Sequence, residues 1–179
     1  NVTGNRCATV HMQLNNSKPF TWQMYCLGRY FNNALVGIEM NWNTAPIEEL
    51  ERLNYPYQYV RQQYDQIGKK LVQRFGWRTD GNTRPLIIDK ETDVVDNYIY
   101  LINDIPTLDE MLSFVYDENN RPDAETGKHD DLLFSEMIAN EIRWQQTTKV
   151  TKKQTPLSEI MEYKDKLAKA NMRNRRRLT

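Results

Sequence analysis

Acidic side chains at two places in this 179-residue sequence have the chemistry to hold divalent metal ions. Glu39 ends a nearly continuous apolar run, 34–39, and Asp130 and Asp131 follow His129 where a helical apolar pattern begins. Carboxylates that meet from separate elements form an oxygen-rich site for divalent metal ions. The structural alternatives are a strand-end acid facing water for Glu39, and two aspartates that stabilise a helix N-terminus.

The elements that must position these acids follow from the hydrophobic pattern. The apolar run 34–39 predicts a strand buried on both faces, and functional groups in open α/β sheets gather at the carboxyl ends of such strands. A helix is expected from about Asp130 to Gln146. The polar stretch 62–74 is ambiguous and compatible with partial helix. The other expected elements are strands at 7–14, 57–60 and 98–102, an extended piece at 75–79, and helices at 19–32, 44–53, 83–97 and from a Thr107 cap.

Composition indicates one soluble globular domain. Hydrophobic residues make up 39% of the chain and charged residues 27%, and the sequence has neither an apolar run of membrane-spanning length nor a signal peptide. Cys7 and Cys26 lack metal-ligand spacing, so we expect reduced residues in or near the core of an intracellular protein. The sequence also has no phosphate-binding loop of the kind that serves ATP hydrolysis.

The net charge of zero hides an uneven distribution. Residues 149–179 contain ten basic and three acidic residues, a net +7, so the rest of the chain carries −7. We therefore predict two parts, a domain over 1–148 and a linker with a basic C-terminal helix or tail over 149–179. Helical periodicity runs from Leu157 to Met172. The tail is expected to bind a polyanion, or else to be a disordered, solubilising terminus.

Five short strings occur in an order that resembles a known family. Together they are similar to the nuclease domain of the large terminase subunit of tailed phages, the DNA-packaging motor, over about Arg6 to Trp144. The strings are Gly37-Ile38-Glu39-Met40-Asn41, Phe75-Gly76-Trp77-Arg78-Thr79, Thr83-Arg84-Pro85, Leu108-Asp109-Glu110-Met111-Leu112-Ser113-Phe114-Val115 and Gly127-Lys128-His129-Asp130-Asp131.

The resemblance implies an RNase H-like α/β fold, with a mixed central sheet flanked by helices. It also implies an endonuclease that cuts concatemeric double-stranded DNA with Mg²⁺ or Mn²⁺, two ions in all. Glu39 would be the central-strand acid and Asp130 the helix-start acid, with Asp131 sharing or taking that role. His129 would orient an aspartate, bind metal or cap the helix. Asn41 would bond a metal-bound water or close its loop.

The same resemblance suggests partners and a location. They are an upstream ATPase domain, a small terminase subunit and a portal protein, in the cytoplasm of an infected bacterial host. The family has a further aspartate on a first strand, and no acid precedes Glu39 here, so we expect the given sequence to begin after that strand. A non-catalytic DNA-binding or assembly module is the alternative. The candidate DNA-binding residues are Arg84, Lys128, Arg173, Arg175, Arg176 and Arg177, whereas Trp77 is expected in the core.

Overall fold

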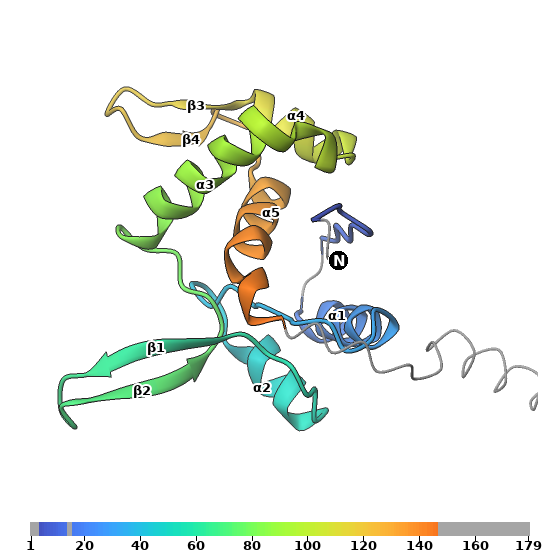
Figure 1. Ribbon diagram of the computed structural model, residues 1–179, viewed down its shortest axis with the longest axis vertical. Helices are drawn as coiled ribbons and strands as arrows, with labels where there is room; N and C mark the ends of the chain where they lie inside the picture. The colour runs from blue at the N-terminus through green and yellow to red at the C-terminus, as the bar shows by residue number, and fades with distance from the viewer. Residues whose placement is uncertain (1–3, 14–15, 147–179) are drawn as a thin grey trace, which may run out of the picture.

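The computed structural model describes residues 4–13 and 16–146, which form a mixed α/β arrangement (Figure 1). The prediction of an α/β chain is therefore confirmed at this level. The α-helices are α1 (Lys18–Tyr30), α2 (Ala45–Arg52), α3 (Thr83–Tyr98), α4 (Ile105–Leu112) and α5 (Asp131–Ile142). The strands are β1 (Val60–Asp65), β2 (Lys70–Phe75), β3 (Phe114–Tyr116) and β4 (Pro122–Ala124), and two short 3-10 helices are η1 (Ile99–Leu101) and η2 (Arg143–Gln145).

Helix α5 is the centre of the main hydrophobic cluster. Its apolar side chains are buried on several sides, and they pack with Ile87 of α3 and with Tyr59 and Trp77 from the segments that flank the β1–β2 hairpin. Figure 1 shows α5 between α3 and the base of that hairpin. Trp77 is 5% exposed, so its predicted place in the core is confirmed. A helix buried around most of its surface needs apolar residues outside a single stripe, as α5 has.

The extended segment 34–40 separates two clusters. Val36 and Ile38 are buried with Ile47 and Leu50 of α2, whereas Leu35 packs against the α5 cluster. Side chains alternate between the two faces of an extended chain, which explains how one short run serves both clusters. The apolar pattern therefore correctly predicted burial on both faces.

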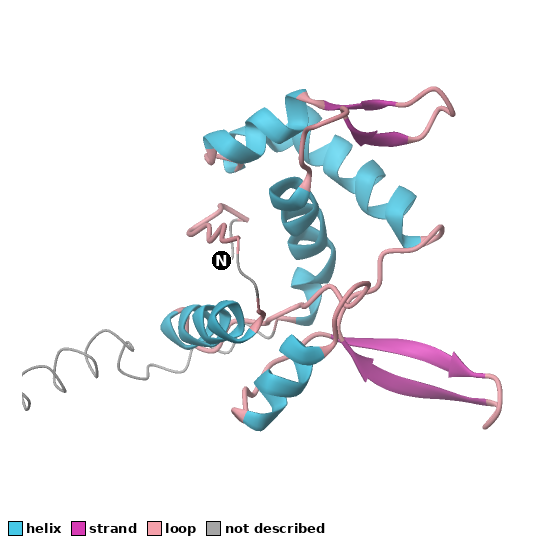
Figure 2. Cartoon of the chain, turned by 180° about the vertical axis from the view of Figure 1, so that it is seen from behind, coloured by secondary structure: helices cyan, strands magenta, loops and turns pink. Residues whose placement is uncertain are grey.

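Hydrogen bonds tie this segment to the base of the hairpin. Val36 forms an isolated parallel bridge with Gln58, and Glu39 forms another with Trp77. The strands of the described residues form two antiparallel pairs, β1 with β2 and β3 with β4 (Figure 2). The expected strand 34–39 is thus extended and hydrogen-bonded but belongs to neither pair, and the RNase H-like central sheet stays a prediction.

Some of the predicted secondary-structure elements do not form. Residues 7–13 contain no strand, and 98–102 continues α3 through η1 instead of forming an edge strand. The ambiguous stretch 62–74 forms most of an antiparallel hairpin, in which Tyr64 pairs with Leu71. Cross-strand contacts of this kind stabilise a hairpin in spite of polar neighbours. The hairpin extends from the body of the molecule (Figure 2).

Three predictions about single residues also need correction. Cys7 and Cys26 are both exposed, so neither is a core residue. Thr107 lies inside α4 and is fully buried, while Asp104 caps the helix by accepting a hydrogen bond from the Thr107 backbone N–H at 3.2 Å. An aspartate with extended backbone geometry is a better cap than a buried threonine, because its carboxylate reaches the free N–H groups.

Within the described residues, no helix is long and apolar enough to cross a membrane.

A partly buried polar network joins the N-terminal segment to α4 and α5. Arg6 donates from Nε to the Glu136 carboxylate of α5 at 2.8 Å, and it forms an ion pair with Asp104 at 3.1 Å. The Arg6 guanidinium also donates to the Thr107 hydroxyl. Glu91 of α3 completes the network, because its carboxylate and that of Glu136 accept hydrogen bonds from the same Asn140 amide group.

Glu91 is the least satisfied member of this network. It is 2% exposed, and its Oε1 atom has no hydrogen-bond partner. Burial raises the pKa of Glu91 from 4.5 to about 7; the Asn140 hydrogen bond lowers it, the Glu136 charge raises it, and Arg6 lowers it. The native state therefore holds a proton on this acid at pH values where the unfolded chain has released it.

We expect Glu91→Gln to remove a loss of native-state stability that the parent suffers as the pH rises. With its pKa raised to about 7, Glu91 favours the native state fully below pH 4.5, and this contribution is lost as the pH rises to about 7. A shift of this size is worth about 3 kcal/mol. The variant should therefore unfold at higher urea concentration than the parent at pH 8, and at nearly the same concentration at pH 4.5. Asp89→Asn, at an exposed position of α3, is the control, and equal pH profiles for Glu91→Gln and the parent would contradict the prediction.

Candidate functional site

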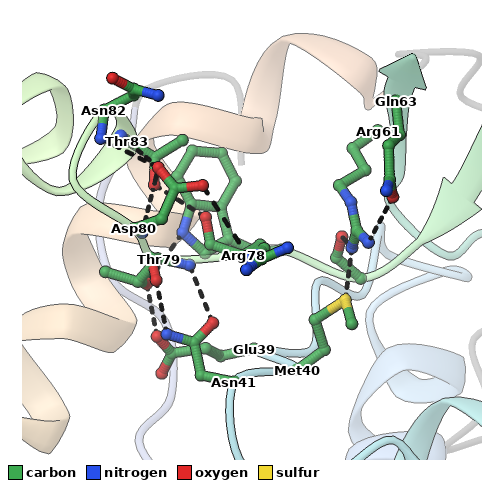
Figure 3. Close-up of polar contacts among 12 residues, drawn as sticks. Glu39, Met40, Asn41, Arg61, Gln63, Arg78, Thr79, Asp80, Asn82 and Thr83 are labelled. Carbon is green, nitrogen blue, oxygen red and sulfur yellow. Dashed lines mark hydrogen bonds and ion pairs between the residues drawn. The ribbon is translucent and has the colours of Figure 1, made fainter. Parts of the chain in front are cut away.

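Glu39 lies at the exposed end of the extended segment 34–40, and Thr79 holds its side chain. The Thr79 hydroxyl donates to Glu39 Oε1 and accepts from the indole N–H of buried Trp77 at 3.2 Å (Figure 3). The backbone bridge between Glu39 and Trp77 also fixes the position of the Glu39 backbone. A carboxylate that is held on a rigid support through one oxygen can offer further lone pairs to a cation or water.

Asn41 closes the loop that follows Glu39. Its amide group pairs with the backbone of Thr79 in both directions, donating to the carbonyl at 2.6 Å and accepting from the N–H at 3.0 Å. Of the two roles predicted for Asn41, loop closure is the one that these contacts support. Asn41 and Thr79 together fix the spacing between the end of segment 34–40 and the approach to α3 (Figure 3).

The chain then turns directly into α3. Asp80 accepts hydrogen bonds from the backbone N–H groups of Asn82 at 2.9 Å and Thr83 at 3.2 Å. These backbone bonds, Asn82 first, lower the pKa of Asp80. Asp80 thus caps the N-terminus of α3 and keeps a negative charge one residue from Thr79.

Asp130 and Asp131 stand at the start of α5, as predicted, but neither caps the helix through its side chain. Glu110 of α4 does so, accepting from the Leu133 backbone N–H at 2.8 Å. The capping explanation for the aspartate pair is therefore not supported by the hydrogen bonds. Asp130 is half-buried and Asp131 is exposed.

Asp130 faces Arg84 of α3. The guanidinium lies 4.0 Å from the Asp130 carboxylate and 3.3 Å from that of Asp123, and it stacks 4.5 Å from the centre of the Phe134 ring. Burial raises the pKa of Asp130, Arg84 lowers it, and the charges of Asp123, Asp131 and Glu110 raise it. These contacts engage Arg84 within the protein, and its role in binding DNA stays a prediction.

The two acidic places have different partners. Glu39 is bonded to Thr79, just before α3, while Asp130 faces Arg84 in the first turn of α3. Both acids thus connect to the N-terminal end of the same helix. Within residues 4–13 and 16–146, no three His, Cys, Asp or Glu side chains gather as a group able to hold a metal ion. The joint site of Glu39, Asp130 and Asp131 stays a prediction.

The remaining candidates are less well defined. His129 and Lys128 are exposed in the loop before α5, which leaves each accessible to a ligand. The whole part over 149–179 lies outside the described residues, and with it the expected helix from Leu157 and the arginines Arg173, Arg175, Arg176 and Arg177.

Comparisons with family models, curated proteins and solved structures found no match for this chain. The site must therefore be interpreted from its own residues. Sequence reasoning missed Thr79, although its string was noted, because a hydroxyl that positions a carboxylate has no spacing signature of its own. It also missed the pairing of Arg61 with Arg74, which depends on the register of the β1–β2 hairpin.

Proposed function

We propose that this chain is a metal-dependent DNA endonuclease domain of the terminase kind, acting in the packaging of phage DNA. The observation that carries the proposal is Glu39. It ends a buried extended segment, its carboxylate is exposed, and Thr79 and Trp77 hold it in one orientation. It also lies in the first of five strings that resemble the terminase nuclease. An acid in this position suits a metal ligand better than a solvated surface residue, because its orientation is fixed in advance.

Glu39 and Asp130, with Asp131 sharing or replacing the latter, would contribute ligands to Mg²⁺ or Mn²⁺, and such ions activate water and stabilise a leaving phosphate oxygen. Within the chain, Thr79 orients Glu39, and Asn41 keeps the following loop against Thr79. Burial raises the pKa of Asp130 most, and the neighbouring carboxylates raise it further. A bound cation would relieve the repulsion between these carboxylates and Asp130. The proposal extends by resemblance to an ATPase domain, a small terminase subunit and a portal protein as partners in an infected bacterium.

Cleavage of supercoiled plasmid DNA by residues 1–179 tests the function. We expect nicked and linear products with Mn²⁺, slower cleavage with Mg²⁺, and none with a chelator, because Mg²⁺ demands a more complete octahedral ligand set than Mn²⁺ does. Plasmid left intact at every metal concentration, by protein whose circular dichroism spectrum reports folded helices, would contradict the nuclease proposal.

A second function, a DNA-binding or assembly module without catalysis, is favoured by one observation. The described residues bring together no group of three side chains of metal-binding type. Such a module would bind duplex DNA with the same affinity in metal and in chelator and would leave plasmid intact. The endonuclease would cleave, so one assay in the two buffers separates the two functions.

A further inference from the structure

Two arginines face each other at the base of the β1–β2 hairpin. The register pairs Arg61 directly with Arg74, so their side chains leave the same face of the ribbon. Like charges placed opposite each other destabilise an antiparallel pair. Burial lowers the pKa of Arg61 most. The positive charges of Arg78 and Arg74 lower this pKa further, whereas Tyr59 raises it. Arg78 lies two residues beyond Gly76, whose carbonyl accepts a hydrogen bond from Arg61, so it adds a third positive charge near the pair.

Few acids balance this cluster. In the part of the chain that the structure describes, neither Arg61 nor Arg74 has a carboxylate within ion-pair distance, and Arg78 has only Asp80 at 4.0 Å. Arg61 donates instead to the Gly76 carbonyl at 2.9 Å and to Gln63 at 3.2 Å, which fixes its guanidinium (Figure 3). Ion pairs elsewhere in the described chain engage Arg6, Arg52, Arg84 and Lys90.

The rest of the hairpin has the charge and shape expected of a polyanion-binding ribbon. Lys69 and Lys70 add two positive charges at its tip, and Asp65 is the one acid within 60–75. The strands extend away from the helices of the molecule (Figure 1). A two-stranded ribbon fits the major groove of duplex DNA, and arginine binds phosphate with paired N–H donors. Charge and shape together favour duplex DNA over a protein partner.

The base of the hairpin also adjoins Glu39. The Arg61 guanidinium donates to the sulfur atom of Met40, the residue after Glu39. Arg78 precedes Thr79, which holds the Glu39 carboxylate. Figure 3 shows Met40 between Glu39 and the Arg61 guanidinium, and Arg78 beside Thr79.

We propose that Arg61, Arg74 and Arg78 form a phosphate-binding cluster, which holds the backbone of a DNA duplex beside Glu39. The inference rests on the proposed function, because it takes DNA as the ligand and Glu39 as the acid that the duplex must reach. A phosphate-binding role explains why two arginines stand opposite each other in the hairpin, although like charges in this position are destabilising. A bound phosphate would neutralise the two positive charges.

Fluorescence anisotropy with a short labelled duplex, in a chelating buffer that prevents cleavage, tests the cluster. We expect Arg74→Gln to weaken binding by about tenfold or more, as for loss of one charge-assisted hydrogen bond. The slope of log affinity against log salt concentration should become shallower by about 0.9. Arg74→Lys, which keeps the charge, should retain the slope. Arg52→Gln removes an exposed arginine of α2 and serves as the control, with affinity close to that of the parent.

Thermal unfolding adds a readout that a merely structural arginine would not give. Arg74→Gln removes the like-charge contact with Arg61, so its melting temperature should equal or exceed that of the parent while DNA affinity falls. Affinity and salt slope equal to those of Arg52→Gln would overturn the cluster. Loss of affinity in Arg74→Gln, together with no metal-dependent cleavage by the parent, would support the cluster and reject the nuclease proposal. Cleavage by the parent with no effect of Arg74→Gln would reject the cluster alone.

Discussion

Glu39→Gln should lower the rate of metal-dependent plasmid cleavage by about 100-fold or more. The substitution keeps the size of the side chain and an oxygen that can accept from Thr79, but it removes the negative charge. An amide is a weak ligand for Mg²⁺ or Mn²⁺, and loss of one charged ligand costs several kcal/mol of the stabilisation that a metal gives to developing charge. Rates measured at a saturating metal concentration separate a chemical defect from weak metal binding.

Glu51→Gln is the matched control, because Glu51 is an exposed acid of α2 and the change has the same chemistry. The control should cleave at the parental rate. Asp130→Asn and Asp131→Asn, compared in the same assay, distinguish which aspartate of the α5 start contributes. A Glu39→Gln protein as active as the Glu51→Gln protein would reject Glu39 as a site residue and, with it, the observation on which the proposed function depends.

The helices were the most predictable part of the fold, because apolar spacing and local capping residues determine them. Helices α1, α2, α3 and α5 begin and end within a few residues of the predicted positions. The start of α4 was misjudged at Thr107, since a threonine hydroxyl near an apolar pattern suggests a cap. The true cap, Asp104, lies two residues before Pro106, and a proline in the first turn is itself a helix-start signal.

The strands were less predictable, because their partners are distant in sequence. The hairpin at 60–75 has polar residues at positions where a half-buried strand would have apolar ones, such as Gln62 opposite Gln73. Neither face of the ribbon is consistently buried, so its hydrophobic pattern is weak. The failure at 7–13 has the opposite cause. Alternation was present in the sequence, but residues 7–13 form no strand with any other described segment, and the Thr9 side chain is bonded to Asp104 instead.

In the candidate site, too, the positions of residues along the chain were predictable, whereas their contacts with distant residues were not. The sequence located Glu39 at the end of a buried run and the aspartates at a helix start, and both placements agree with the structure. It could not reveal that Glu110 caps α5 in place of those aspartates, because that bond joins residues 23 positions apart. Nor could it reveal that Arg84 faces Asp130. Such contacts arise from how α3, α4 and α5 pack, and they determine which charges are free to bind a ligand.

The strongest destabilisation expected from a single polar change is at Arg6. Its side chain is 10% exposed and joins Asp104 at the start of α4 to Glu136 in α5. Arg6→Met would retain much of the apolar stem but leave two partly buried carboxylates without their cation, close to buried Glu91. Removing one partner from a buried ion pair costs about 3–5 kcal/mol, because the remaining charge stays desolvated. We therefore expect the urea midpoint to fall strongly at pH 8.

Arg52→Met is the matched control, because Arg52 pairs with Glu49 on an exposed helix surface, where solvent screens the two charges and little stability depends on the pair. Arg6→Lys should recover part of the loss, since it restores the charge but not the donors that reach Glu136, Asp104 and Thr107 together. The Arg6 charge also lowers the pKa of Glu91. Its removal should therefore extend the decline of stability to higher pH than in the parent. Equal urea midpoints for Arg6→Met and Arg52→Met would show that the network does not hold the N-terminal segment to α4 and α5.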